Sequence, residues 1–266
     1  MKIIDLSLPI DDTAFEVHPL RIDRISHKEG VEKLNKTIMC RTKQGESDYL
    51  KGVRIIRKED LPDEEFLSLE MVYSSVHSGT HLDYSFHYGS LSEGKPSKTA
   101  DEIPLEWCYN DGVRLDFTFK KPGQVITSDD IDSALKKINY SLKPMDIVLI
   151  WTGSDKLFGK PEYFSDYLGI DISAIDFLLD RGIKIFGVDT MSIDRPYKYM
   201  MKEFLDKKDP SILWPAHFHG RKREFIHIER LANLGSLPDS GFKISCFPVR
   251  IRKTGAAWTR AVGIIR

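Results

Sequence analysis

The sequence predicts an α/β fold in a single domain, and two features carry that prediction. Residues 145–151 are almost entirely apolar, which is typical of a central strand buried on both faces. A helix-like segment at 171–179 follows and leads to a second apolar strand at 183–189, which is the order of a β-α-β unit. No repeat, low-complexity tract or interdomain linker divides residues 1–266, so one domain is the simplest organisation.

The first third of the chain is expected to contain two strands around a charged segment. Residues 2–9 alternate and end at a proline, which predicts a first strand. Residues 25–65 are rich in charged side chains, and we interpret them as a surface insertion with some strand around 52–56. Residues 67–73 alternate again and predict a strand that leads the chain to His77.

The rest of the chain alternates between helix and strand. Thr127 or Ser128 can cap a helix over 129–138, and Asp171 can cap the helix that ends at Leu179. The remaining strands are predicted at 113–117, 242–248 and 261–265, and the segment 224–229 is followed by a short turn at 231–235.

Composition and charge exclude several classes of protein. The net charge of −1 argues against nucleic acid as a partner, since phosphate binding normally requires a concentrated basic surface. No segment reaches the roughly 18 apolar residues of a membrane-spanning helix, and the short apolar N-terminus is broken by Asp5, which is unlike a signal peptide. Cys40, Cys108 and Cys246 form no paired motif, so no disulfide framework is expected and a cytoplasmic location fits best.

The densest functional signal is the segment 77–87, which reads His-Ser-Gly-Thr-His-Leu-Asp-Tyr-Ser-Phe-His and holds three of the eight histidines. Imidazole nitrogens and a carboxylate are ligands that Zn²⁺ and Mn²⁺ accept. A histidine left off the metal can move protons near neutral pH. The segment therefore predicts half of a metal-hydrolase active site.

The spacing of these residues favours an extended segment over a helix. On a helix His77 and His81 share a face, but Asp83 points away from His81 by about 200°, and Gly79 weakens the helix by about 1 kcal/mol. On a strand all three residues and His87 lie on one face, because the side-chain period is two. We therefore expect an extended segment with a bulge or turn at Gly79.

A purely structural role for this cluster is the alternative interpretation, with the histidines forming hydrogen bonds at a strand–loop junction. Clustered unpaired polar groups are costly to bury, which disfavours that alternative. Three of the groups could bind a metal and leave positions open for water and substrate, as a catalytic site requires. His87 is then the candidate proton shuttle.

A second concentration of histidine contains His217, His219, His227 and Glu229. If this region is extended, the first two share one strand face and the last two share another. A histidine and a carboxylate from here could complete the coordination sphere or hold a second ion. Spacing alone does not choose among the histidines, and each could equally have a surface or supporting role.

The first segment resembles the pattern His-x-Gly-Thr-His-x-Asp-x-Pro-x-His of the metal-dependent cyclase-like hydrolases, a family that includes bacterial kynurenine formamidase and isatin hydrolase. Ser85 stands where the pattern has proline. His217 and Glu229, followed by Leu-Ala-Asn-Leu, resemble the histidine and glutamate of the family in type and separation. The stretches 146–153 and 187–194 also resemble family segments.

The resemblance implies a set of metal ligands divided between two positions, with His77, His81 and Asp83 at the first, and His217, Glu229 and a bridging Asp83 at the second. Glu229 would also bridge, and His87 would be the proton donor and acceptor. The implied cofactor is one or two ions of Zn²⁺ or Mn²⁺. The implied structure is an α/β fold with a mixed, β-barrel-like sheet core flanked by helices, assembled as a homodimer or homotetramer.

Other positions depart from the family pattern. The early segment reads Val-His-Pro-Leu at 17–20, where the family often has Trp-Pro-Gly, and residues 255–260 lack the family's Gly-x-Pro-x-Arg pattern. The metal residues match while these substrate-contacting positions differ. We therefore expect metal-dependent hydrolysis without naming the substrate.

Together these features predict hydrolysis of an amide, formamide or lactam C–N bond by metal-activated water, with His87 as the proton shuttle. The substrate is expected to be a small molecule, and Phe15, His18 and Trp214 are candidate walls of its pocket. Neither nucleic acid nor a membrane is an expected partner. Two alternatives remain: a metal-dependent lyase or dehydratase, and a non-catalytic metal- or ligand-binding protein on the same scaffold.

Overall fold

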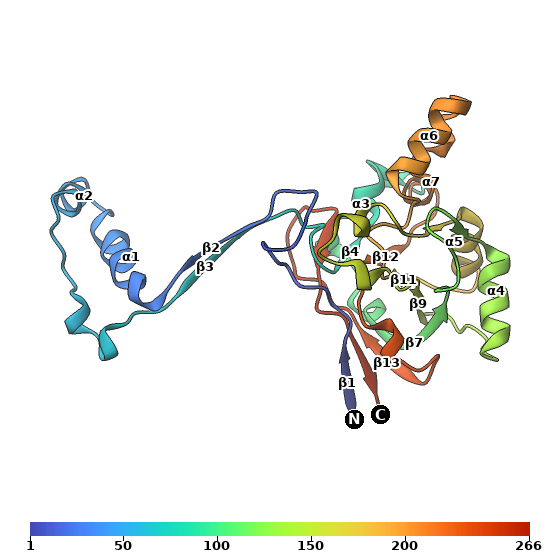
Figure 1. Cartoon of the computed structure of the whole chain (residues 1–266), viewed down its shortest axis with the longest axis horizontal. Coiled ribbons are helices and arrows are strands. Elements are labelled where there is room, and N and C mark those ends of the chain that lie inside the picture. The colour runs from blue at the N-terminus through green and yellow to red at the C-terminus, as the bar shows by residue number, and fades with distance from the viewer. The chain divides into compact units, whose positions relative to one another are not determined.

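The structure, a computed structural model, describes residues 1–266 and divides the chain into two compact units (Figure 1). The first unit consists of Met1–His18 and Ser75–Arg266, and the second consists of Pro19–Ser74. The segment interpreted as an insertion, 25–65, lies within the second unit.

The first unit is built around one curled sheet of nine strands. From one edge to the other they are β1 (Lys2–Asp5), β15 (Val262–Ile265), β13 (Phe242–Ser245), β7 (Tyr109–Asp116), β9 (Ile147–Trp151), β11 (Ile185–Val188), β12 (Ile226–Glu229), β4 (His81–Asp83) and β14 (Ala256–Trp258). Strands β7, β9, β11 and β12 are parallel, and the pairings toward both edges are antiparallel. The pairing of β1 with β15 places the two chain ends side by side (Figure 1). The predicted α/β class with a mixed sheet is confirmed.

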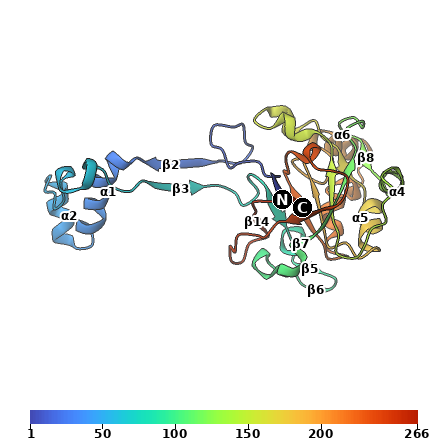
Figure 2. The ribbon, with the colours of Figure 1, turned by 90° about the horizontal axis from the view of Figure 1, so that it is seen from below.

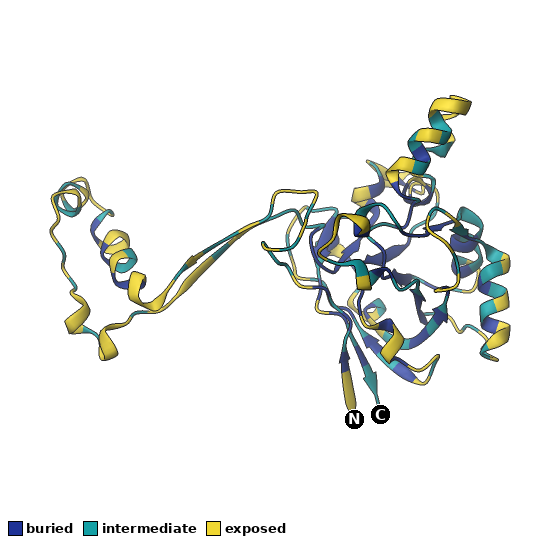
Figure 3. Cartoon of the chain, viewed as in Figure 1, coloured by how far each residue is buried: buried dark blue, intermediate teal, exposed yellow.

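Apolar side chains cover both faces of the sheet centre. Along β9, Ile147 and Leu149 pack into one hydrophobic core and Val148 and Ile150 into the other, because successive side chains of a strand point to opposite faces. The helices α4 (Ser128–Lys137) and α5 (Ile172–Leu179) contribute to the second core and lie next to one another (Figure 2). The central strands are accordingly almost entirely buried (Figure 3).

The two predicted helix starts are confirmed by their caps. The Thr127 hydroxyl accepts a hydrogen bond from the Asp130 N–H, and the Asp130 carboxylate accepts one from the Thr127 N–H at 2.8 Å. Asp171 caps α5 by accepting a hydrogen bond from the Ser173 N–H at 2.9 Å. Because β9 and β11 pair in parallel on either side of α5 in the sequence, they form the predicted β-α-β unit.

The first unit has three further α-helices and two short strand pairs, beside several 3-10 turns. They are α3 (Ser85–Tyr88), α6 (Tyr197–Lys207), α7 (Pro215–His219), the pair β5 (Leu91–Ser92) with β6 (Lys95–Pro96), and the pair β8 (Val125–Ile126) with β10 (Gly169–Ile170). Helix α6 was not predicted, and Met200 is its only buried residue, so an apolar periodicity is weak there. None of the helices has both the length and the apolar character needed to cross a bilayer.

The second unit contains a two-stranded ribbon and two helices. Strand β2 (Arg21–Ile25) pairs antiparallel with β3 (Leu69–Tyr73), and α1 (His27–Met39) and α2 (Lys43–Leu50) lie between them in the sequence. Ser26 and Glu29 form a capping box that begins α1. Most residues of α1 and α2 are exposed or only partly buried (Figure 3).

The prediction of a strand at 52–56 is wrong, because the backbone of this segment forms hydrogen bonds with a side chain and not with a neighbouring strand. The N–H groups of Ile55 and Ile56 donate to Asn35 Oδ1, each at 3.0 Å, and Asn35 Nδ2 donates to the Ile56 carbonyl at 2.7 Å. Asn35 is buried on α1 and takes the hydrogen bonds that a partner strand would supply. A local sequence pattern does not reveal such a contact.

Asp189 connects the ends of the neighbouring strands β9 and β11 and is fully buried. Its carboxylate accepts hydrogen bonds from the Thr152 N–H at 2.9 Å, the Thr152 hydroxyl at 2.6 Å and the Gly153 N–H at 2.6 Å. Burial raises the pKa of Asp189 to about 7, although these hydrogen bonds act in the opposite direction.

We expect Asp189 to make the free energy of unfolding depend on pH. Its stabilisation is fully present below the unfolded pKa of 3.8 and is lost as the pH rises through about 7, because the native carboxyl retains a proton that the unfolded chain releases. In metal-free protein, Asp189→Asn should therefore destabilise more at about pH 5 than at about pH 8, as measured by urea denaturation. Equal losses at both pH values would contradict the raised pKa.

Candidate metal centre

The candidate site lies on one face of the β4–β12 strand pair. In this antiparallel register His227 stands opposite Asp83, and Glu229 stands opposite His81. The intervening residues of both strands are apolar and point to the other face, into a hydrophobic core. A slip of one residue would send the four polar side chains into that core, so the apolar positions also fix the polar face.

The loop before β4 turns sharply at Gly79, where φ is +64°. A Cβ there would lie 3.0 Å from Ile10 Cγ1, so glycine suits both the conformation and the space. The adjacent Thr80 hydroxyl accepts a hydrogen bond from the Leu8 N–H at 2.8 Å and donates one to the Arg230 carbonyl. The turn expected at Gly79 is thus confirmed, and these bonds hold it between the N-terminal segment and the end of β12.

His77 and His81 each direct one ring nitrogen at the same oxygen of Asp83, and these three residues form the outer group. His77 Nδ1 lies 3.0 Å from Asp83 Oδ1, His81 Nε2 lies 3.5 Å from it, and the two nitrogens are 3.3 Å apart. Ligands of a tetrahedral ion with bonds of about 2.0–2.1 Å are separated by about 3.3 Å. The Nδ1 atom of His81 lies 2.9 Å from the Gly79 carbonyl and donates to it, which leaves the Nε2 lone pair facing the group.

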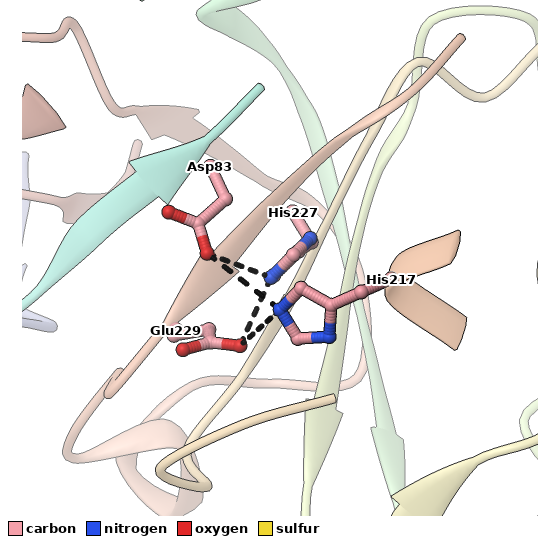
Figure 4. A group of neighbouring side chains, drawn as sticks. All are labelled: Asp83, His217, His227 and Glu229. Atoms are coloured by element: carbon pink, nitrogen blue, oxygen red, sulfur yellow. Dashed lines mark hydrogen bonds and ion pairs between the residues drawn. The ribbon is translucent and has the colours of Figure 1, made fainter. Parts of the chain in front are cut away.

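Asp83 Oδ2 and Glu229 Oε1 face two further imidazoles, those of His217 and His227. These four residues form the inner group (Figure 4). His227 Nε2 lies 3.2 Å from Asp83 Oδ2 and 3.0 Å from Glu229 Oε1. His217 Nε2 lies 3.9 Å and 3.7 Å from the same two oxygens. The other oxygen of Glu229 lies 3.6 Å from His81 Nε2, so each carboxylate has one oxygen toward each group.

Asp83 is the buried centre of both groups, with 1% of its side chain exposed and neither oxygen accepting a hydrogen bond. Burial alone would raise the pKa of Asp83, but the nearby imidazoles of His77, His87 and His81 hold it well below its usual range. A buried carboxylate needs positive charge beside it, which imidazolium or a metal ion can supply, and imidazole with carboxylate is a donor set that Zn²⁺ and Mn²⁺ accept. The cluster therefore fits a divalent metal.

His217 is held from behind by Asp194, which follows β11. Asp194 Oδ2 lies 2.6 Å from His217 Nδ1, and the same carboxylate accepts hydrogen bonds from the N–H groups of Ala216 at 2.8 Å and His217 at 3.2 Å. Because Nδ1 donates to a carboxylate, the Nε2 atom of His217 is left to face the inner group.

The expectation that His217 and His219 share a strand face is wrong, because both lie on helix α7. Pro215 at the start of α7 favours the helix, and residues two apart on a helix differ in direction by about 200°. His219 accordingly points elsewhere, with its Nε2 atom 2.9 Å from Asp176 Oδ1.

His87 lies on helix α3, so the expectation of one extended segment over 77–87 is wrong beyond Asp83. One third of its side chain is exposed (33%), and its Nε2 atom lies 3.7 Å from Asp83 Oδ2. Burial lowers the pKa of His87 to about 4 despite the attraction of Asp83, so the ring is neutral at neutral pH and can accept a proton. Gly255 packs against its backbone, where a Cβ would lie 2.9 Å from His87 Cα.

A cavity of about 360 Å³ opens beside the cluster. Its walls combine imidazole, aromatic and other side chains, from His18, His77, His87, Met191, Ser192, Trp214, His217, Phe218, Glu229 and Arg230. Two of the expected walls, His18 and Trp214, are among them. Phe15 is not, and its ring packs against Phe164 with the centroids 5.5 Å apart.

Three residues of this arrangement have no assignment from the sequence alone. His227 was one of several histidines that spacing could not separate, and Asp194 was noted only within a stretch that resembles the family. Tyr88, whose hydroxyl lies 2.9 Å from His227 Nδ1, carried no signal of its own, because its role depends on a contact between distant segments.

Comparisons with known proteins agree with the fold. The model of the Cyclase family, described as "Putative cyclase", matches residues 4–195. Kynurenine formamidase of Bacillus mycoides (strain KBAB4) is 28% identical over 194 residues, which cover 71% of this chain and 76% of that protein.

Two solved structures extend the likeness to the whole chain. An isatin hydrolase bound to the product analogue thioisatinate has a TM-score of 0.71 at 18% identity and covers 99% of this chain and 92% of that one. A potential metal-dependent hydrolase with cyclase activity has a TM-score of 0.59 at 20% identity and covers 100% of this chain and 98% of that one. The cyclase-like fold expected from the sequence is confirmed.

We expect Asp194→Asn to weaken metal binding about 10- to 100-fold, because an amide cannot accept hydrogen bonds from all three N–H groups and His217 loses its fixed orientation. Titration of metal-depleted protein with Zn²⁺ or Mn²⁺ in a calorimeter measures this. Asp176→Asn is the matched control, since Asp176 contacts His219 outside the cluster, and it should bind metal like the wild type. Unchanged affinity in Asp194→Asn would refute the positioning role.

Proposed function

The chain belongs to the cyclase family, and from this premise we propose that it is a metal-dependent hydrolase that cleaves the C–N bond of an amide, formamide or lactam. The supporting observation is the buried cluster of imidazoles around Asp83 and Glu229 at the wall of a cavity. A resident divalent ion would lower the pKa of a water molecule and polarise a substrate carbonyl. The residues proposed to hold such ions are His77, His81, Asp83, His217 and Glu229.

The protein residues that face the cavity supply the remaining chemistry. His87 lies at the cavity wall, close to Asp83 and partly exposed, and its pKa of about 4 keeps it neutral at neutral pH. It is thus placed to accept the proton of the attacking water and to return it to the leaving nitrogen. Asp83 would fix the positions of the outer histidines, and Asp194 would fix His217.

The cavity favours a small, partly aromatic substrate. A volume of about 360 Å³ suits a small molecule, and Trp214, Phe218 and His18 supply flat ring surfaces along its wall. One relative is named kynurenine formamidase and one structural neighbour is named isatin hydrolase. Aryl formamides and cyclic aryl amides are therefore the substrates we propose to test first.

Removing the proposed proton shuttle should abolish turnover without emptying the metal site. His87→Ala is expected to lower kcat about 100- to 10,000-fold, the usual contribution of general acid–base catalysis, while metal content stays at the wild-type level. Turnover of an aryl formamide and metal analysis by mass spectrometry give the two readouts. His219→Ala, a histidine outside the cluster, is the control. Full turnover by His87→Ala would remove His87 from the mechanism.

Removing the shared carboxylate should empty the site. Asp83→Ala deletes the oxygens that face both groups, and we expect the purified variant to lose bound metal and activity together.

The products of the wild-type reaction, weighed by mass spectrometry, should carry the mass of one added water. A product lighter by one water would indicate a lyase or dehydratase, and metal content unchanged in Asp83→Ala would contradict the proposed ligand set.

A further inference from the structure

His227 has no role in the ligand set proposed above, yet it occupies the centre of the inner group. It lies on β12 with no exposed surface, directly across from Asp83 in the strand register. The rings of Tyr88 and Phe186 stack with its ring at centroid distances of 5.6 Å and 6.1 Å. The imidazole is therefore held in one orientation by flat neighbours.

The hydrogen bonds of Tyr88 fix a proton on the Nδ1 atom of His227. The Tyr88 hydroxyl has a single proton and donates it to the backbone carbonyl of Asp83 at 2.9 Å. His227 Nδ1 lies 2.9 Å from the same hydroxyl oxygen, so Nδ1 must donate its N–H to that oxygen. Nε2 faces the two carboxylates, and the proton that it donates to Glu229 Oε1 in the metal-free protein is the one that a metal ion would displace.

The Nε2 atom of His227 is closer to the carboxylates than that of His217. It lies 3.2 Å from Asp83 Oδ2 and 3.0 Å from Glu229 Oε1, whereas His217 Nε2 lies 3.9 Å and 3.7 Å from these atoms. The four ligand atoms lie within 4.8 Å of one another and come from different directions (Figure 4). Two neutral imidazoles and two carboxylates form a complete four-coordinate ligand set for a divalent transition metal.

We propose that His227 is a metal ligand, and that with Asp83, His217 and Glu229 it makes the inner position a closed, four-ligand site for a divalent transition-metal ion. The outer group supplies His77, His81 and Asp83 Oδ1, and 26% of the His77 side chain is exposed. Closed sites hold metal for structure, and open ones bind water and substrate. The inner ion is then the more firmly held of the two, and the outer ion is the exchangeable one. This inference rests on the proposed function for its premise that the cluster binds metal.

The experiment follows the metal content of the full-length protein during dialysis against increasing concentrations of a chelator. Zn²⁺ per chain is counted by mass spectrometry in the wild type, His227→Gln, His77→Gln and the control His219→Gln, a buried histidine of α7 outside the cluster. Wild type and His219→Gln should lose the outer ion at low chelator concentration and retain the inner ion. His77→Gln should lack the outer ion. His227→Gln should lose the inner ion at a chelator concentration about 10- to 100-fold lower than the wild type does.

A second variant keeps the test decisive if His227→Gln does not fold. Tyr88→Phe retains the stacked ring and removes the hydroxyl that fixes the proton on His227 Nδ1. It should lower the affinity for the inner ion about 10- to 100-fold. Far-UV circular dichroism checks the fold of each variant.

The outcomes separate the two proposals. If folded His227→Gln and Tyr88→Phe both keep the inner ion as firmly as the wild type, His227 is not a metal ligand. His227 would then be an ion-pair partner of the carboxylates, and the proposed metal-dependent hydrolase would be unaffected. A wild type that takes up no metal under any condition would overturn the proposed function itself.

Discussion

The site depends on the antiparallel register between β4 and β12. That register pairs Asp83 with His227 and His81 with Glu229, and it sends the apolar residues between them into the core on the opposite face. Hydrophobic burial therefore decides on which face the polar cluster lies, since a slip of one residue would turn the polar side chains into the apolar core. The carboxylates can be buried because imidazoles surround them, and a cation at this place would offset their charge further.

Hydrogen bonds behind the cluster orient its histidines before any ligand arrives. His81, His217 and His227 each place Nδ1 against a fixed acceptor, namely the Gly79 carbonyl, the Asp194 carboxylate and the Tyr88 hydroxyl. In each case the Nε2 atom is left facing Asp83 or Glu229. Three different segments supply these acceptors, so the same arrangement is built by separate parts of the fold.

The likeness to known proteins covers the fold more completely than it covers the cavity. The family model matches residues 4–195, and the structural neighbours share the fold over nearly the whole chain at 18–20% identity. The side chains that line the cavity include Trp214 and Phe218, which lie outside the region matched by the family model. The family model and the shared fold thus place the chain in a family, while part of the cavity wall lies beyond the region that the family model matches.

Short sequence patterns predict the elements whose signals are local. The β9–α5–β11 unit, its caps, the turn at Gly79 and the crowding of ligand-type residues at 77–87 all follow from short patterns, and the family pattern pointed to His217 and Glu229. Tertiary structure alone decided the rest. His217 and His219 diverge because α7 is a helix, Asn35 replaces a strand partner for 55–56, and Tyr88 orients His227 from a distant segment. Each of these depends on contacts between residues far apart in the chain, which side-chain periodicity does not encode.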